Sequence, residues 1–324
     1  MQDLNQAIDK IKLAAKQKLA RENYRDYLLY VHHGLYEHFK HTILLANILQ
    51  GIAEGKSTKL IICLPPRHSK SMSISETFPS YYIGKNPNKR VITTAYGDSL
   101  ARKFGRLNKQ KIDEFGKGLF DVELSDENAS NNNWSLKGYR GGMISTGIGG
   151  AITGEGADLL IVDDPYKNHE MAYSEVQREK VWNEWQNTLL TRLQKGASVI
   201  IIMTRWHEDD LVGKLLLSEK DKWELISFPA ISEDESDILG REIGEPLCPG
   251  LGFDEEWAEN KEREVGSVSW NALYQQRPSA PEGNMIKRQW WKYYKVLPGH
   301  MDEQLISVDA TFKNKKDSDF CVLQ

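Results

Sequence analysis

A lysine and a serine stand just after an apolar run, in front of a segment with helical character. The run is Leu-Ile-Ile-Cys-Leu at residues 60–64, and Pro-Pro-Arg-His-Ser separates it from Lys70 and Ser71. A buried strand, a tight turn and a Lys-Ser pair form a phosphate-binding loop, in which backbone N–H groups hold phosphate oxygens and the hydroxyl ligates Mg²⁺. The spacing G-x-x-x-x-G-K-[ST] is kept, although Leu64 and Ser69 occupy the glycine positions. Alone, the pattern fits a plain loop with a surface lysine equally well.

Two carboxylates follow a second apolar run, Leu-Leu-Ile-Val at residues 159–162. Asp163 and Asp164 are expected at the carboxyl end of this strand, where ligands bind in open α/β sheets. ATP hydrolysis needs one carboxylate to hold Mg²⁺ and a second to orient and deprotonate the attacking water, and we assign these roles to Asp163 and Asp164 in turn. An Asp-rich turn is the alternative. Lys70 lies about 90 residues earlier, a separation typical of such ATPases, so the two motifs together favour nucleotide hydrolysis.

A third apolar run, at residues 199–203, ends at Thr204 and Arg205. Thr204 is predicted to sense the γ-phosphate and to pass its loss to a moving element, whereas a plain strand end is the alternative. Arg205 is predicted to contact phosphate or a neighbouring segment, or to lie on the surface. His207 and the three acidic residues after it suggest a metal site, but we favour a helix start at which the acidic side chains complement the dipole.

The elements that must position these groups alternate along the chain. Short apolar runs followed by longer helical patterns predict an α/β fold with a parallel sheet covered by helices on both faces. Residues 126–133 are polar and predict a surface loop. Strands are expected at residues 60–64, 91–96, 142–146, 159–163 and 198–204. Helices are expected at 4–15, 24–52 with a break near Gly34, 70–82, 99–115, 174–192 and 209–218.

The composition excludes several classes of protein. The net charge of −4, from 42 basic and 46 acidic residues, does not predict a broad basic face, so DNA contacts would be local or shared among subunits. Three distant cysteines, Cys63, Cys248 and Cys321, lack metal-ligand spacing and fit a reduced, intracellular setting. The sequence has neither a secretory signal nor an apolar run near the ~18–20 residues that span a membrane.

After residue 218, charged helical segments and turns replace the long apolar strands. We expect an ATPase core with N-terminal helices at residues 1–218, a lid and linker subdomain at 219–299, and the start of another domain at 300–324. Residues 277–283, Arg-Pro-Ser-Ala-Pro-Glu-Gly, are a linker candidate. Two strands at residues 305–310 and 319–323 would begin that last domain, and this chain is therefore expected to be a fragment of a longer protein.

Together these motifs resemble the large terminase subunit of tailed bacteriophages, the ATP-driven DNA-packaging motor. The family often has Pro-Pro-Arg in a glycine-poor phosphate loop, and it usually has Asp-Glu where this chain has Asp163 and Asp164. Ser69 replaces a glycine that is common in the family, so a positive φ there would strain the serine. The resemblance covers most of the chain through residues 65–71, 93–96, 154–164, 204–207 and 270–278.

The resemblance implies a RecA-like (ASCE) P-loop ATPase with a small helical lid. ATP is then held by Pro66, Arg67, His68, Ser69, Lys70 and Ser71. Mg²⁺ is held by Ser71 and Asp163, Asp164 activates water, and Thr204 relays hydrolysis to the lid, which moves DNA. The implied partners are double-stranded DNA, the portal protein, the small terminase subunit and further copies of the chain in a ring, for which the family expectation is five subunits on the procapsid. The implied setting is the host cell cytoplasm, without a membrane.

Arginines are expected at the catalytic centre, because an arginine finger gives large rate factors. Arg67 lies inside the loop and is a candidate within its own chain, whereas Arg140 is a candidate that acts in a neighbouring subunit's site. Arg102 and Arg106 on a predicted helix are further candidates, and a solvated surface arginine is the alternative for each. Two tyrosines before the loop, at positions 24 and 27, are predicted to pack helices rather than to cover the adenine base.

Large terminases also carry an RNase H-like nuclease that uses two metal ions. Ser307 to Ala310 resembles its first strand, and Asp309 resembles its first metal ligand. One carboxylate cannot hold two metal ions ~4 Å apart. We therefore expect no nuclease activity from this chain, and a standalone nuclease is disfavoured.

Two other functions stay open at this point. A helicase-like ATPase would respond to single-stranded rather than duplex DNA. A non-catalytic assembly or DNA-binding module with a decayed nucleotide site would not bind ATP–Mg²⁺, although the intact Lys70, Ser71, Asp163 and Asp164 argue against it.

Overall fold

The computed structural model describes residues 2–150, 152, 154, 156–279, 308–309 and 322–323. The chain divides into two compact units, Met1–Glu282 and Gly283–Gln324, ahead of the last domain boundary expected at residue 300. In the second unit, β9 (Val308–Asp309) pairs antiparallel with β10 (Val322–Leu323). The side chain of Asp309 and the rest of the expected strands lie outside the described residues, as does most of the expected linker.

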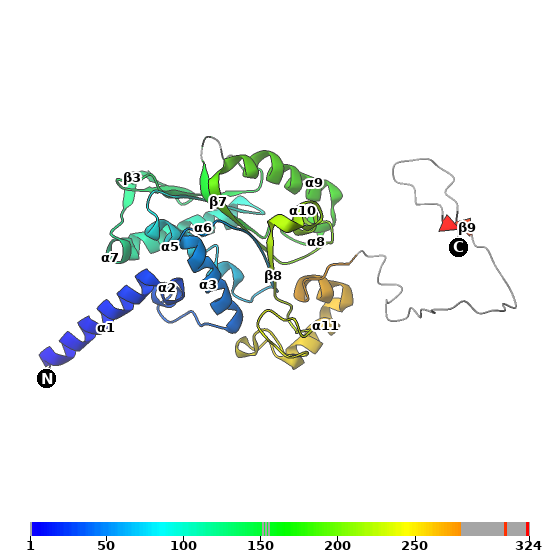
Figure 1. The fold of residues 1–324 in the computed structure, drawn as a ribbon, viewed down its shortest axis with the longest axis horizontal. Coiled ribbons are helices and arrows are strands. Elements are labelled where there is room, and N and C mark those ends of the chain that lie inside the picture. Colours follow the sequence, from blue (N-terminus) through cyan, green and yellow to red (C-terminus); the bar gives the residue numbers. More distant parts are fainter. Residues whose placement is uncertain are drawn as a thin grey trace. The chain divides into compact units, whose positions relative to one another are not determined.

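An eight-stranded sheet forms the centre of the first unit, in the order β3-β4-β5-β2-β6-β7-β1-β8 (Figure 1). The six strands from β5 to β8 in that order pair in parallel, whereas β3 and β4 pair antiparallel at one edge. The expected parallel α/β sheet is thus confirmed as the larger part of a mixed sheet. The strands are β1 (Lys59–Cys63), β2 (Arg90–Ala95), β3 (Leu124–Ala129), β4 (Asn133–Leu136), β5 (Gly142–Gly147), β6 (Ala157–Asp163), β7 (Leu193–Met203) and β8 (Glu224–Ser227).

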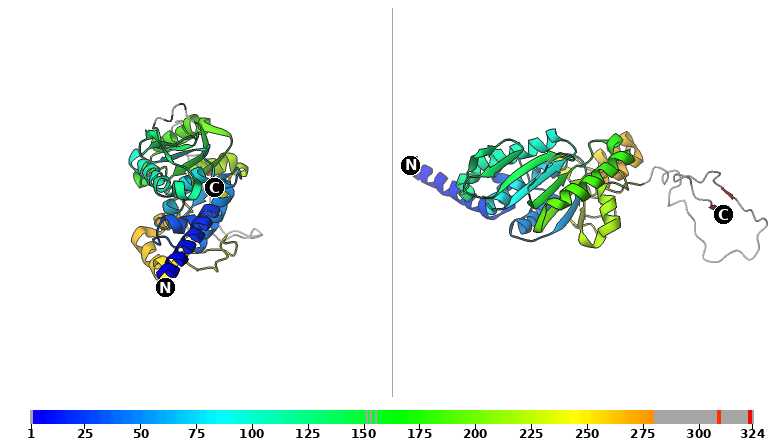
Figure 2. Two further views of the ribbon diagram at one scale, coloured as in Figure 1. Left: turned by 90° about the vertical axis from the view of Figure 1, so that its left-hand side faces the viewer. Right: turned by 90° about the horizontal axis from the view of Figure 1, so that it is seen from above.

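Alternate side chains of the central strands enter two separate cores, as the period of two in a strand requires. In β1, Leu60 and Ile62 pack with α2 (Tyr24–Val31), α3 (Lys40–Ala53), α5 (Phe78–Lys85) and α6 (Asp98–Lys111). Ile61 and Cys63 pack on the other face with α8 (His169–Tyr173), α9 (Glu175–Glu184) and α10 (Leu211–Glu219). Burial on both faces explains why these strands are apolar without interruption. Figure 2 shows the helices on the two sides of the sheet.

Most of the expected helices are present. The break predicted near Gly34 is confirmed, because residues 24–52 form α2 and α3, and the helices expected at 70–82, 99–115 and 174–192 do not run through as single α-helices. The expected helix at 70–82 is two helices, because the chain turns after Ser73 and restarts at Phe78 with Pro79 in the first turn, where proline is tolerated. The stretch after α9 continues as a π-helix and a 3₁₀ turn. The helices are α1 (Gln2–Glu22), α2 (Tyr24–Val31), α3 (Lys40–Ala53), α4 (Lys70–Ser73), α5 (Phe78–Lys85), α6 (Asp98–Lys111), η1 (Ile112–Gly116), α7 (Lys117–Phe120), α8 (His169–Tyr173), α9 (Glu175–Glu184), η2 (Trp185–Leu189), η3 (Leu190–Arg192), α10 (Leu211–Glu219), η4 (Lys220–Lys222), η5 (Pro249–Leu251), α11 (Glu255–Ser269) and η6 (Trp270–Tyr274).

The prediction of a surface loop at residues 126–133 is wrong in part. Most of β3 lies in it, and β4 begins at its last residue. This antiparallel pair sits at the edge of the sheet, where one face meets water, so its outer positions need no apolar side chains.

The tyrosines that precede the phosphate loop pack in the core, as predicted. Tyr24 and Tyr27 are fully buried. The hydroxyl of Tyr24 donates to the carbonyl oxygen of Ser73 at 2.6 Å, and that of Tyr27 lies 2.9 Å from the hydroxyl oxygen of Ser80. These bonds hold α4 and α5 against α2, so the two tyrosines stabilise the helices that follow the phosphate loop.

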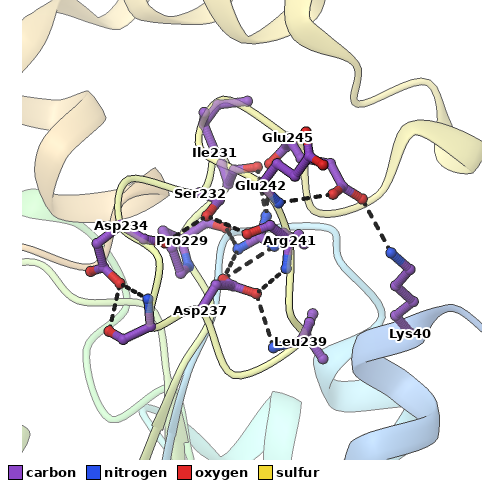
Figure 3. Close-up of polar contacts among 12 residues, drawn as sticks. Lys40, Pro229, Ile231, Ser232, Asp234, Asp237, Leu239, Arg241, Glu242 and Glu245 are labelled. Carbon is purple, nitrogen blue, oxygen red and sulfur yellow. Dashed lines mark hydrogen bonds and ion pairs between the residues drawn. The ribbon is translucent and has the colours of Figure 1, made fainter.

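Residues 228–277, here called the lid segment, follow β8 in the same compact unit. The core sheet thus extends past residue 218, because β8 pairs with β1. Arg241 organises the irregular first half (Figure 3), with its side chain only 1% exposed and paired to Asp237 at 2.8 Å. Its guanidinium also donates to the carbonyl oxygens of Pro229 at 3.0 Å and Glu245 at 3.2 Å. In the second half, α11 contains a break at Gly266, whose φ is 78° and ψ 157°.

The described helices include none that is both long enough and apolar enough to cross a bilayer.

Candidate nucleotide-hydrolysis site

The sheet order brings the three predicted motifs together. β7 lies between β1 and β6, and all three strands are parallel, so their carboxyl ends share one edge. Lys70 follows β1, Thr204 follows β7, and Asp163 ends β6. Ligands bind at this edge of open α/β sheets, so the predicted groups occupy the expected place.

Lys70 forms the centre of a hydrogen-bonded cluster. Its Nζ atom lies 2.9 Å from Oδ1 and 2.7 Å from Oδ2 of Asp164, and it donates to Oγ1 of Thr204 at 2.7 Å. The backbone N–H of Thr204 also donates to Asp164, at 3.1 Å. The hydroxyl of Thr204 in turn donates to the carbonyl oxygen of Leu64 at 3.2 Å. A lysine, the expected base and the expected sensor are therefore in direct contact, although they come from three strands.

Asp163 and Ser71 fit the requirements of a Mg²⁺ site. Asp163 is fully buried, and its Oδ1 accepts a hydrogen bond from Ser71 Oγ at 3.4 Å. Its Oδ2 is buried and has no hydrogen-bond partner among the residues that the structure describes. Burial, and then the charge of Asp164, raise the pKa of Asp163. A divalent cation would reverse that shift, because it favours the ionised carboxylate and satisfies the unpaired oxygen.

The phosphate loop holds non-glycine residues in the left-handed region of backbone conformation. Ser69 has φ 62°, which is the strain predicted for this position, and Arg67 has φ 66°. Asp164 also has a positive φ, of 44°. Each such residue costs about 1–3 kcal/mol and persists only where the surroundings enforce it. Three of the six non-glycine residues with positive φ in the described part of the chain thus lie at this edge of the sheet.

The ring of His68 packs against Phe253 of the lid segment. It is 1% exposed, and its Nδ1 donates to the carbonyl oxygen of Pro66 at 2.8 Å. Burial lowers the pKa of His68 to about 4, so the ring is neutral near pH 7. The predicted role of His68 in holding nucleotide is therefore a role for its backbone, whereas its side chain packs against the lid segment.

The candidate arginines lie in different places. Arg67 is exposed on the phosphate loop itself. Arg140 is exposed in the turn before β5, and its backbone N–H donates to Asn88 at 3.2 Å. That turn lies at the amino ends of β2 and β5, opposite the edge that carries Lys70, so only a role in a neighbouring subunit's site stays a prediction for Arg140.

Arg205 has a partner that the sequence pattern did not reveal. Its Nε pairs with the fully buried Asp210 at 2.8 Å, and its backbone N–H donates to Oε1 of Gln276 in the lid segment at 3.2 Å. Asp210 also caps α10 by accepting from the N–H of Gly213 at 2.9 Å, which confirms the helix start predicted after His207. The described residues contain no cluster of three or more His, Cys, Asp or Glu side chains that suits a metal ion.

A model of one protein family matches most of the chain. The family model described as "Terminase large subunit, T4likevirus-type, N-terminal" matches residues 61–292. A search of curated proteins finds no match.

Phage large terminases are among the solved structures that match this chain. The large terminase of bacteriophage HK97 is 13% identical over 68% of this chain and 47% of its own, with a TM-score of 0.41. That of a thermophilic bacteriophage in complex with ADP is 14% identical over 79% of this chain and 57% of its own, with a TM-score of 0.41. The ATPase domain of a Thermus phage large terminase is 12% identical over 74% of this chain and 94% of its own, with a TM-score of 0.44. The chain spans about half the length of the first two.

The parallel-dominated sheet with helices on both faces is that of a RecA-like ATPase. The strand that carries Thr204 lies between the strand of the phosphate loop and that of Asp163. Since the family model covers well over half of its residues, the chain belongs to the terminase large subunit family, and it contains the N-terminal part that this model describes.

Proposed function

We propose that this chain binds ATP with Mg²⁺ at the edge formed by β1, β7 and β6, and that hydrolysis drives double-stranded DNA into a procapsid. The contact of Lys70 with both Asp164 and Thr204 carries the proposal. A lysine for phosphate charge, a carboxylate for water and a hydroxyl that senses the γ-phosphate are the parts that ATP hydrolysis requires.

The residues divide the chemistry between them. The backbone of residues 64–71 and Lys70 hold the phosphates. Ser71 and Asp163 would hold Mg²⁺, which when bound would supply positive charge to neutralise the phosphates. Asp164 takes a proton from the water that attacks the γ-phosphorus while the bond to the ADP oxygen breaks. This yields ADP and phosphate. Positioning and electrostatics do most of the work in such a reaction.

Thr204 connects the reaction to the lid segment. Its hydroxyl contacts Lys70, and the next residue, Arg205, contacts Gln276 through its backbone N–H. Loss of the γ-phosphate changes the hydrogen-bond partners of Lys70 and Thr204. The change reaches the lid segment through Arg205, the residue after Thr204, whose backbone N–H contacts Gln276. We propose that this movement acts on duplex DNA.

The family membership supports further proposals about the assembly. A ring of copies on the portal protein would let Arg140, on the opposite edge of the sheet, complete a neighbouring subunit's site. The family expectation of five copies, the small terminase subunit as a partner and the host cell cytoplasm as the setting belong to the same proposal.

The test is phosphate release from ATP by the full chain, with Lys70→Ala as the disabled variant and Lys89→Ala as the matched control. Lys89 also pairs with an aspartate, Asp158, at 2.8 Å, but at the amino end of β6. We expect Lys70→Ala to abolish activity, Lys89→Ala to keep it, and duplex DNA to stimulate it more than single strands do. Equal rates for wild type and Lys70→Ala contradict the proposal. Stronger stimulation by single strands favours the helicase-like alternative, and failure to bind ATP–Mg²⁺ in calorimetry favours the non-catalytic one.

A further inference from the structure

His68 belongs to the phosphate loop, but its ring belongs to the packing of the lid segment. The imidazole stacks on Phe253 with 4.5 Å between ring centroids and 29° between the planes, and it lies 6.1 Å from the ring of Trp257. The residues on either side, Arg67 and Ser69, both have positive φ. These two left-handed residues turn the chain so that Arg67 is exposed while the side chain between them is buried.

The ring is also tied to the backbone of the loop. Its Nδ1 donates to the carbonyl oxygen of Pro66 at 2.8 Å, and the carbonyl oxygen of His68 accepts from Nε2 of His41 at 3.1 Å. Any shift of the backbone at residues 66–68 therefore shifts the imidazole. Because protein interiors are close-packed, Phe253 has little room to stay in place when the imidazole moves.

An aromatic cluster continues from Phe253 through the lid segment. Phe253 lies 4.7 Å from Trp257, and Trp257 lies 5.8 Å from Tyr274. Tyr274 stacks on Trp270 at 5.0 Å. The cluster ends two residues before Gln276, whose side-chain oxygen accepts a hydrogen bond from the backbone N–H of Arg205. The lid segment thus touches the hydrolysis edge at two separate points.

We propose that His68 is a positioning residue that couples phosphate binding to the lid segment through its stack on Phe253. This connection is separate from that of Thr204. The ring of His68 moves with the backbone of the loop, whereas Thr204 responds to the γ-phosphate. The inference rests on the proposed function, because it requires the loop to bind a nucleoside triphosphate.

Amide hydrogen exchange of the full chain, with and without ATPγS and Mg²⁺, tests this coupling. In wild type we expect nucleotide to change the exchange of residues 253–274. His68→Ala reduces that change at least threefold, whereas His68→Phe, which keeps a stacking ring, restores most of it. His33→Ala is the matched control, because His33 is exposed and pairs with Glu114 at 3.1 Å on the surface.

Phe253→Ala removes the same contact from the side of the lid segment. It therefore distinguishes loss of the contact from a folding defect in the phosphate loop. It reproduces the effect of His68→Ala, and the double variant loses nothing further, as expected for two residues that act through one contact. Two results overturn this inference but leave the proposed function standing. One is a nucleotide-dependent exchange change in His68→Ala as large as in wild type. The other is a change in His68→Phe as small as that in His68→Ala. Calorimetry on the same samples separates this from the proposed function: a wild-type chain that does not bind ATPγS overturns both.

Discussion

Asp164→Asn separates the two roles that the structure gives to Asp164. The carboxylate is the expected base, and it also holds Lys70 at 2.7 Å in a pair whose side chains are 10% and 26% exposed. A phosphate oxygen that binds Lys70 must replace part of this contact. Asparagine keeps the volume and can still accept from the N–H of Thr204, but it removes the charge. The variant should therefore bind nucleotide more tightly while it hydrolyses ATP more slowly.

The magnitudes follow from the contacts. A charged hydrogen bond contributes about 1.5–3 kcal/mol, and recovery of roughly half of this by phosphate corresponds to about tenfold tighter binding. Loss of a general base costs about 10²–10⁴-fold in rate. We expect the Kd for ATPγS to fall about tenfold in calorimetry, and kcat for phosphate release to fall at least a hundredfold.

Asp158→Asn is the control, because it makes the same change at the other end of β6. Asp158 accepts from Lys89 at 2.8 Å at the amino end of β6, so both Kd and kcat should stay at wild-type values. Weaker or unchanged binding by Asp164→Asn would refute the competition between phosphate and carboxylate. Unchanged turnover would refute the assignment of the base.

Three further predictions concern stability. Ser69→Gly relieves a positive φ of 62° and should raise the free energy of unfolding by about 0.5–1 kcal/mol in urea denaturation, because the strain removed exceeds the entropy that glycine adds to the unfolded chain. Burial lowers the pKa of His68 to about 4, below its unfolded value, so the unfolded state takes up the proton first. Stability is then lost as the pH falls from about 6.5 towards 4, and His68→Phe should reduce that slope by about 1.4 kcal/mol per pH unit. Arg241→Met leaves the buried carboxylate of Asp237 unpaired and should cost about 3–5 kcal/mol in the same assay.

Each of these has a control or a contrary result. Ser99→Gly, in the exposed first turn of α6, should destabilise, so a gain there would show that glycine stabilises for another reason. An unchanged acid slope in His68→Phe would mean that the histidine is not the group that titrates. Lys117→Met breaks a surface pair with Asp121, and it should leave the melting temperature unchanged while Arg241→Met lowers it.

The sequence predicted the parts of the site whose residues follow buried strands. The apolar runs at residues 60–64 and 159–162 locate β1 and β6, and the polar residues after them meet because parallel strands end at one edge. Their types suggested ATP chemistry before any contact was known. The same logic failed for β3, because an edge strand with one face in water need not be apolar.

Contacts between distant segments could not be read from local pattern. Nothing near His68 indicates that its ring stacks on Phe253, 185 positions later in the numbering. Arg205 and Gln276 meet in the same way, through packing of the lid segment against the core. These contacts depend on how whole segments pack, and neither propensity nor spacing records that.

The break at Gly266 divides α11 between the two points at which the lid segment is held. Phe253 precedes the break and Gln276 follows it, so each half of the helix has its own attachment to the hydrolysis edge. A straight helix would force both attachments to move as one rigid rod. With a left-handed glycine between them, the two attachments lie on separate helical segments, which the contact of Trp257 with Tyr274 joins across the break. Under the proposed function, phosphate that binds beside His68 and phosphate that leaves Thr204 would therefore act on different segments of one jointed element.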